Sequence, residues 1–231
     1  MASVPHLAVT RENETSEDNT PLHCASQRGD LEVVKYLMDK GAKTDEQNSW
    51  KATPLHWAAG RGDIEVVKYF VENGADITLK NDHQDTPLHK ASEGGHLDVV
   101  KYLIQKGAEV NATNDLKDTP LHKAASGGRL QVANYLIENG AEVNSKNEKE
   151  LTPLHHASFS RSLSVMQCLV EHGAEVEARD NEGLPSNFVC TLKVPDIYKH
   201  PGFKKKLKEF LAACKTDAPV GGSCCAFGTP C

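Results

Sequence analysis

The stretch TPLHWAAGRGDIEVVKYFVENGA, residues Thr53–Ala75, contains two helical patterns, each followed by a glycine. Thr-Pro at its head is typical of a helix start, because the threonine hydroxyl can cap the helix and a proline in the first turn loses no hydrogen bond. We expect this helix to run to about Arg61, where Gly62 ends it. A second set of apolar residues then recurs at helical spacing: Ile64, Val67 and Phe70. Gly74 supplies a left-handed C-terminal cap, so the stretch predicts a helix hairpin.

The hairpin is one of five copies. Thr-Pro-Leu-His begins every 33 residues without insertion or deletion, at Thr20, Thr53, Thr86, Thr119 and Thr152. The Gly-Ala pair at the far end keeps the same step, at Gly41, Gly74, Gly107, Gly140 and Gly173. A 33-residue period with Thr-Pro-Leu-His-x-Ala is the signature of ankyrin repeats, and the chain resembles that family over residues 14–183. The resemblance implies an all-α solenoid of stacked helix hairpins with β-turn fingers between them.

The repeat pattern stops before a sixth copy. A further Thr-Pro-Leu-His is due at residue 185, but the chain there reads NEGLPSNFVCTLKVPDIYKHPGF. Within the divergent segment 184–214, the stretch Phe203–Cys214 places apolar residues on one helical side and lysines around the other. We expect an amphipathic helix that caps the exposed end of the last repeat. Residues 1–13 are expected to be a flexible N-terminus.

The last segment, 215–231, is rich in Gly, Pro, Ser and Cys and is predicted to be disordered. Cys224 and Cys225 follow the basic amphipathic helix, and their palmitoylation would supply a second signal for membrane attachment. The alternative is a passive tail with free thiols. Prenylation is not expected, because Gly228 stands where the required cysteine would be.

Composition narrows the function. The formal net charge of −6 would repel a phosphate backbone, so nucleic acid is not an expected partner. The N-terminus lacks the basic start and apolar stretch of a signal peptide, which makes a cytoplasmic or nuclear location the default. No phosphate-binding glycine loop, nucleophile elbow or metal-ligand spacing occurs, so we expect neither an enzyme nor a cofactor. A monomer is expected.

One histidine recurs in every copy: His23, His56, His89, His122 and His155. Such a row could suggest metal binding, but the side chains stand 33 residues apart, one in each stacked unit. In ankyrin repeats this histidine makes structural hydrogen bonds at the head of the first helix. The resemblance therefore implies a structural role.

Positions that change from copy to copy are better candidates for function, because the scaffold does not dictate them. In ankyrin proteins the fingers and the first helix line the face that holds a partner protein. The changing residues there are Trp50, Trp57, Arg61, His83, Lys90, Leu116, Lys123, His156 and Phe159. Trp and Arg are frequent binding hot spots, which makes Trp50, Trp57 and Arg61 the central candidates. The alternative for Trp57 is that it fills space between repeats.

The finger departs from the family pattern. Ankyrin repeats usually have glycine two residues before the threonine, whereas this chain has Asp18, Lys51, Gln84, Lys117 and Glu150. An asparagine lies three residues earlier in four copies: Asn48, Asn81, Asn114 and Asn147. We expect these asparagines to take the left-handed backbone angles instead.

Asn111 and Asn144 occur in LIQKGAEVNA and LIENGAEVNS, which resemble sites where ankyrin proteins are hydroxylated on asparagine. The alternative is that asparagine is simply the residue that this turn requires.

Three functions remain after these observations. The first is a non-catalytic module that binds a partner protein through the fingers and first helices. The second is an adaptor or effector whose repeats select a target while residues 184–231 recruit another protein or a membrane. The third, an enzyme, lacks both a motif and a sequence segment that could form a catalytic domain.

Overall fold

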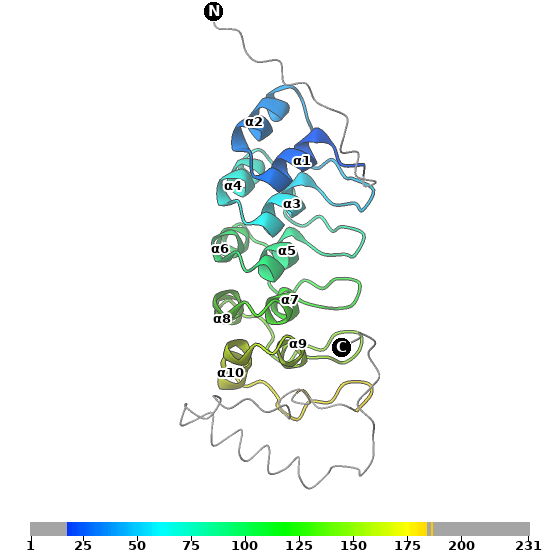
Figure 1. Cartoon of the computed structure of the whole chain (residues 1–231), viewed down its shortest axis with the longest axis vertical. Helices are drawn as coiled ribbons and strands as arrows, with labels where there is room; N and C mark the ends of the chain where they lie inside the picture. The colour runs from blue at the N-terminus through cyan, green and yellow to red at the C-terminus, as the bar shows by residue number, and fades with distance from the viewer. Residues whose placement is uncertain (1–17, 184–185, 187–231) are drawn as a thin grey trace, which may run out of the picture. The chain divides into compact units, whose positions relative to one another are not determined.

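The computed structural model describes residues 18–183 and 186, which form ten α-helices (Figure 1). The first helices of the five hairpins are α1 (Pro21–Arg28), α3 (Pro54–Arg61), α5 (Pro87–Gly94), α7 (Pro120–Ser126) and α9 (Pro153–Phe159). The second helices are α2 (Leu31–Asp39), α4 (Ile64–Glu72), α6 (Leu97–Gln105), α8 (Leu130–Glu138) and α10 (Leu163–Glu171). The five predicted hairpins are confirmed. None of these ten helices is long and apolar enough to cross a membrane.

The hairpins stack into two columns of helices, with the fingers projecting beside the first helices (Figure 1). Each first helix contacts the first helix of the next repeat, and the second helices do the same. The leucine of every Thr-Pro-Leu-His lies fully buried in this stack: Leu22, Leu55, Leu88, Leu121 and Leu154. Burial of a leucine side chain contributes about 1.5–3 kcal/mol, so this row stabilises the whole array.

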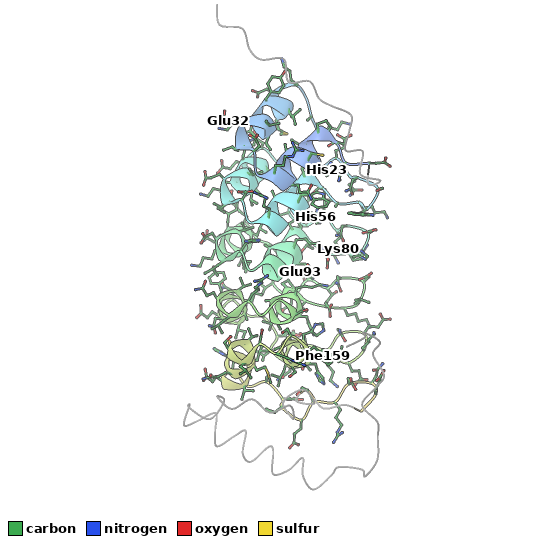
Figure 2. The ribbon with its side chains drawn as sticks, in the orientation of Figure 1. His23, Glu32, His56, Lys80, Glu93 and Phe159 are labelled. Carbon is green, nitrogen blue, oxygen red and sulfur yellow. The ribbon has the colours of Figure 1, made fainter. Side chains whose placement is uncertain are left out.

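The histidine of Thr-Pro-Leu-His joins its own helix to the next repeat. Figure 2 labels two of these side chains, His23 and His56. In repeat 2, the backbone N–H of Thr53 donates to Nδ1 of His56 at 3.1 Å, and the threonine hydroxyl lies 2.9 Å from the same nitrogen. Since Nδ1 accepts, Nε2 carries the proton and donates to the carbonyl of Asp85 at 3.0 Å. The same two bonds recur at His23, His89 and His122. The structural role predicted for this row is confirmed. The threonine hydroxyl also pairs with the imidazole ring.

Glycine after the first helix makes room for the next repeat. Gly62 ends α3, as predicted, and its backbone lies in the left-handed region at φ 91°. A Cβ on Gly62 would lie 2.2 Å from Nδ1 of His96. The ring of His96 therefore fits against the end of α3, where its Nε2 lies 2.9 Å from the carbonyl oxygen of Gly60. The predicted cap at Gly74 is also confirmed, with φ 88°.

The fingers correct one expectation. The left-handed angles belong to the residues that stand where the family has glycine, namely Asp18, Lys51, Gln84, Lys117 and Glu150, with φ from 47° to 59°. The prediction that the asparagines take these angles was wrong. They act through their side chains, because Oδ1 of Asn48 accepts from the backbone N–H groups of Trp50 and Ala52 at 3.0 and 2.9 Å. Asn114 and Asn147 make the same pair of bonds.

The described chain continues past the fifth hairpin at Ser186. Its backbone N–H donates to the carbonyl oxygen of Ala178 at 3.0 Å, and its hydroxyl donates to the carbonyl oxygen of Val176 at 2.7 Å. Its carbonyl accepts from the hydroxyl of Ser158 on α9. Ser186 therefore belongs to the packing of the last repeat. Residues 1–13, the expected helix 203–214 and the segment 215–231 lie outside the described residues.

The buried histidines predict that the protein loses stability in mild acid. Burial lowers the pKa of His56 to about 4, and it also lowers the pKa values of His23, His89 and His122. In the unfolded chain these rings bind protons below about pH 6.5, whereas the folded protein resists protonation. Between pH 7 and pH 5 the free energy of unfolding should therefore fall, by about 2 kcal/mol from His56 alone and further from the other three rings, as measured by urea denaturation. His56→Gln should flatten this dependence, and stability that holds or rises toward pH 5 would contradict the account.

The left-handed backbone angles of the finger residues predict that glycine at such a position would stabilise the protein. Gln84 has φ 58°, an angle that costs a residue with a side chain about 1–2 kcal/mol. Gln84→Gly removes this cost but adds backbone entropy to the unfolded chain, so the free energy of unfolding should rise by up to about 1 kcal/mol. Gly95→Ala is the opposite control, since a Cβ there would lie 2.6 Å from Cδ of Arg129 and should destabilise. Denaturation curves that rank the two variants the other way would refute the strain.

Candidate protein-binding surface

A groove of about 690 Å³ lies between the fingers and the first helices of repeats 2 and 3. Five of the nine predicted partner-binding residues line it: Trp50, Trp57, Arg61, His83 and Lys90. They come from two successive fingers and from α3 and α5. The structure therefore brings the three central candidates, Trp50, Trp57 and Arg61, together at one site.

The two tryptophans form the aromatic part of this groove. Their rings stack with centroids 6.3 Å apart and an angle of 30° between the planes. Trp50 belongs to the finger and is 42% exposed, whereas Trp57 lies half-buried on α3. Such offset stacking is a favourable arrangement for aromatic side chains. Trp57 therefore packs within its own repeat and also presents a face to the groove.

Backbone hydrogen bonds align the fingers one below another. The N–H of Asp82 donates to the carbonyl of Trp50 at 2.8 Å, and Asp115 donates to His83 at 3.0 Å. Glu148 and Leu116 repeat the bond at 2.8 Å. This alignment places the same finger position of each repeat at the same edge of the solenoid. The side chain at that position is free to vary.

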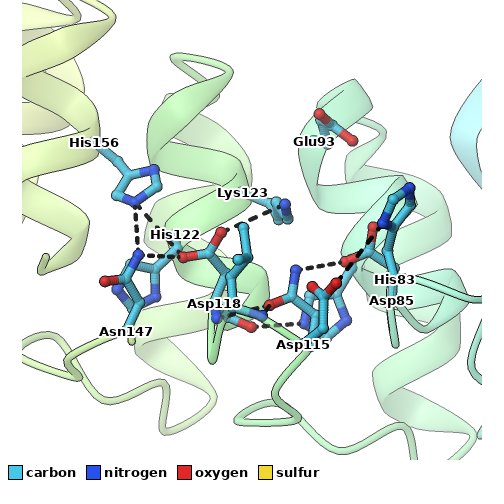
Figure 3. Close-up of polar contacts among 12 residues, drawn as sticks. His83, Asp85, Glu93, Asp115, Asp118, His122, Lys123, Asn147 and His156 are labelled. Carbon is cyan, nitrogen blue, oxygen red and sulfur yellow. Dashed lines mark hydrogen bonds and ion pairs between the residues drawn. The ribbon is translucent and has the colours of Figure 1, made fainter. Parts of the chain in front are cut away.

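Below the groove, a ladder of polar side chains runs through repeats 3 and 4 (Figure 3). Its first step is Asp85, which is buried, accepts from Nδ2 of Asn114 at 2.9 Å and pairs with Nζ of Lys90 at 3.1 Å. Burial alone would raise the pKa of Asp85, but the bond from Asn114 and the nearby lysines lower it. The carboxylate is therefore charged at neutral pH, and its ion pair with Lys90 fixes that side chain in the groove.

Asp118 repeats this arrangement one unit further along. It accepts from Nδ2 of Asn147 at 2.8 Å and lies 3.5 Å from Nζ of Lys123. His156 adds a third neighbour, with Nε2 3.6 Å from Oδ1 of Asp118. Burial lowers the pKa of His156 to about 4, although Asp118 opposes the shift, so the ring is neutral at physiological pH. Lys123 and His156 are therefore part of this ladder of polar side chains.

The ladder is interrupted at repeat 2. Where repeats 3 and 4 have Asp85 and Asp118, repeat 2 has Ala52, which offers no side-chain acceptor to Asn81. Five residues later, repeats 3 and 4 place the lysine that pairs with the aspartate, whereas repeat 2 has Trp57. The two exchanges replace a buried ion pair with apolar surface at the position where the groove opens.

The remaining two candidates lie apart from the groove. Leu116 on the fourth finger is 46% exposed, and Phe159 at the end of α9 is 53% exposed (Figure 2). Neither lines the groove between repeats 2 and 3. They remain candidates for contacts with a partner that extends along the solenoid.

Three charged residues of the groove were not predicted: Asp82, Glu93 and Arg129. Arg129 precedes α8, and its Nε donates to the carbonyl of Glu93 at 3.0 Å, one repeat away. The position of Arg129 varies between copies as Asp30, Asp63, His96, Arg129 and Ser162. That variation was the signal available in the sequence.

The structure describes two of the four predicted modification sites, Asn111 and Asn144. Nδ2 of Asn111 donates to the carbonyl of Gly140 at 3.0 Å, and Oδ1 accepts from the N–H of Glu142 at 3.0 Å. Asn144 makes the matching bonds to Gly173 and Glu175. Both side chains therefore link neighbouring repeats, and their hydroxylation stays a prediction. Cys224 and Cys225 lie outside the described residues.

No group of three or more His, Cys, Asp and Glu side chains is arranged to hold a metal ion within residues 18–183 and 186. No curated protein sequence matches the chain significantly. A family model described as ankyrin repeats (3 copies) matches residues 22–114 and again residues 88–180. Together these matches cover all five hairpins of the structure. The chain therefore belongs to the ankyrin repeat family.

Proposed function

We propose that this protein is a non-catalytic binding module that holds a partner protein in the groove between repeats 2 and 3. Ankyrin repeats are in general protein–protein interaction modules. The observation that carries the proposal is the replacement of the polar ladder by Ala52 and Trp57 at the mouth of this groove.

The groove has the composition of a binding hot spot. Hot spots are enriched in tryptophan and arginine, and charged groups surround them at the rim. Here the stacked pair Trp50 and Trp57 is flanked by Arg61, Lys90 and Arg129. The exposed aromatic surface is costly in the free protein and would be covered in a complex.

The interruption of the ladder provides a test that leaves the fold intact. In Ala52→Asp/Trp57→Lys, the introduced carboxylate can accept from Asn81 as Asp85 accepts from Asn114, and the introduced lysine can pair with it. The new hydrogen bond and ion pair offset part of the packing lost with the half-buried indole of Trp57, so the free energy of unfolding should fall by no more than about 2 kcal/mol. Capture of the partner from a cell lysate, quantified by mass spectrometry against the unchanged protein, should fall by at least about tenfold, because a central hot spot is worth about 2 kcal/mol or more.

Two further proteins complete this experiment. Lys68→Ala removes an exposed ion pair with Glu65 on α4, outside the groove, and should retain full capture. A chain that ends at Val189 keeps Ser186 on the last repeat and should also retain it. Capture that survives the ladder exchange would overturn the proposal. Capture that is lost only on truncation would assign recruitment to the residues after Val189.

A further inference from the structure

The charged groups around the groove already have partners within the protein. Nε of Arg61 lies 2.8 Å from Oδ2 of Asp63, and Nζ of Lys90 lies 3.1 Å from Asp85. Nε of Arg129 donates to the carbonyl of Glu93 at 3.0 Å. A ligand therefore gains little by bringing a charge to the centre of the groove, because it would have to compete with these internal pairs.

The aromatic part of the groove is the surface that lacks a partner. The stacked rings of Trp50 and Trp57 form an aromatic wall of the groove, and small residues beside it leave the groove open: Ala52, Gly60 and Gly94. Trp50 is 42% exposed, so its outer face is in water in the free protein. A flat, uncharged group placed against this wall would bury apolar surface on both sides.

One polar atom of the groove also lacks a partner. Nε1 of Trp57 is shielded from solvent and has no hydrogen-bond acceptor in the described part of the chain. A shielded N–H without an acceptor costs about 1–3 kcal/mol. Because Nε1 is shielded, side chains around it must move on binding to admit a ligand, and Trp50 is exposed enough to move. A ligand carbonyl oxygen there would satisfy it.

We propose, as a deepening of the function proposed above on which it rests, that the groove binds an extended proline-containing segment of the partner. A prolyl ring would lie against the Trp50–Trp57 wall, and a backbone carbonyl would accept from Nε1 of Trp57. Proline suits the site because the polyproline II conformation is formed before binding, its carbonyls are free, and proline has no N–H to leave unpaired. Aromatic-lined grooves recognise proline-rich segments in this way.

The protein contains only two tryptophans, and both lie in the groove, so their fluorescence reports directly on occupancy. The probe is an acetylated, amidated decaproline titrated into the full chain. We expect a saturable change in tryptophan emission, with a Kd of about 0.1–1 mM, typical of a weak peptide contact. Peptides of the same length with the sequences (Gly-Ser)5 and (Ser-Leu)5 should bind at least about tenfold more weakly, since neither is restricted to polyproline II before binding.

Matched variants separate the hydrogen bond from the ring contact. Trp57→Phe keeps an aromatic face but removes the N–H, and should weaken decaproline binding by about 5–10-fold, the value of one hydrogen bond. Trp50→Phe retains the wall and should weaken it by less than about threefold. Changing sodium chloride from 50 to 500 mM should alter the Kd by less than about twofold, because the ligand is uncharged.

Three results would overturn this inference: no saturable response to decaproline, binding of (Ser-Leu)5 as tight as that of decaproline, or no effect of Trp57→Phe. A strong salt dependence would show that charged groups of the groove govern the binding and would overturn it too. If decaproline fails while partner capture still depends on Ala52→Asp/Trp57→Lys, only the proline inference is lost. If capture is also insensitive to that exchange, the proposed function fails with it.

Discussion

The hydrogen bonds of one imidazole ring hold this fold together. In each of the first four repeats the ring accepts from the threonine that starts its own helix and donates to a carbonyl of the following repeat. A single side chain thus sets both the start of a helix and the spacing of its neighbour. Each ring must be neutral to do this, and its burial lowers its pKa accordingly.

Other positions between the repeats fall into two groups. Asp85 and Asp118, with their asparagine and lysine partners, add a buried polar ladder to the histidine hydrogen bonds. Ala52 and Trp57 interrupt it. Because each repeat contacts only its neighbours, an interruption in one unit leaves the others intact. A repeat array can therefore place a binding site in one unit without loss of the whole fold.

Much of this architecture was predictable from the sequence, because a fixed period reports local structure directly. The caps at Gly62 and Gly74 and the hairpins follow from residues within one repeat, whereas the structural role of the histidines, which bond to the next repeat, was implied by the resemblance to ankyrin repeats. The groove was predictable only in part. Trp57 was a candidate because its position varies, but Arg129 reaches the carbonyl of Glu93 from the next repeat, and such a contact depends on three-dimensional packing.

The finger angles show a different limit. Propensity favours asparagine over lysine or glutamine for a left-handed angle. Here, however, Oδ1 of each of three asparagines is used to bind two backbone N–H groups of the turn. Those bonds constrain the turn so that its last residue, such as Lys51, takes the strained angle. The hydrogen bonds of the turn therefore outweigh the backbone preference of the single residue.

The most direct test of the binding account is amide hydrogen exchange of the protein with and without its captured partner. The account predicts slower exchange in the finger at Asp82 and His83 and in α3 from Trp57 to Arg61, with α4 and α6 unchanged. Protection confined to the second helices, with the groove still exchanging freely, would contradict it.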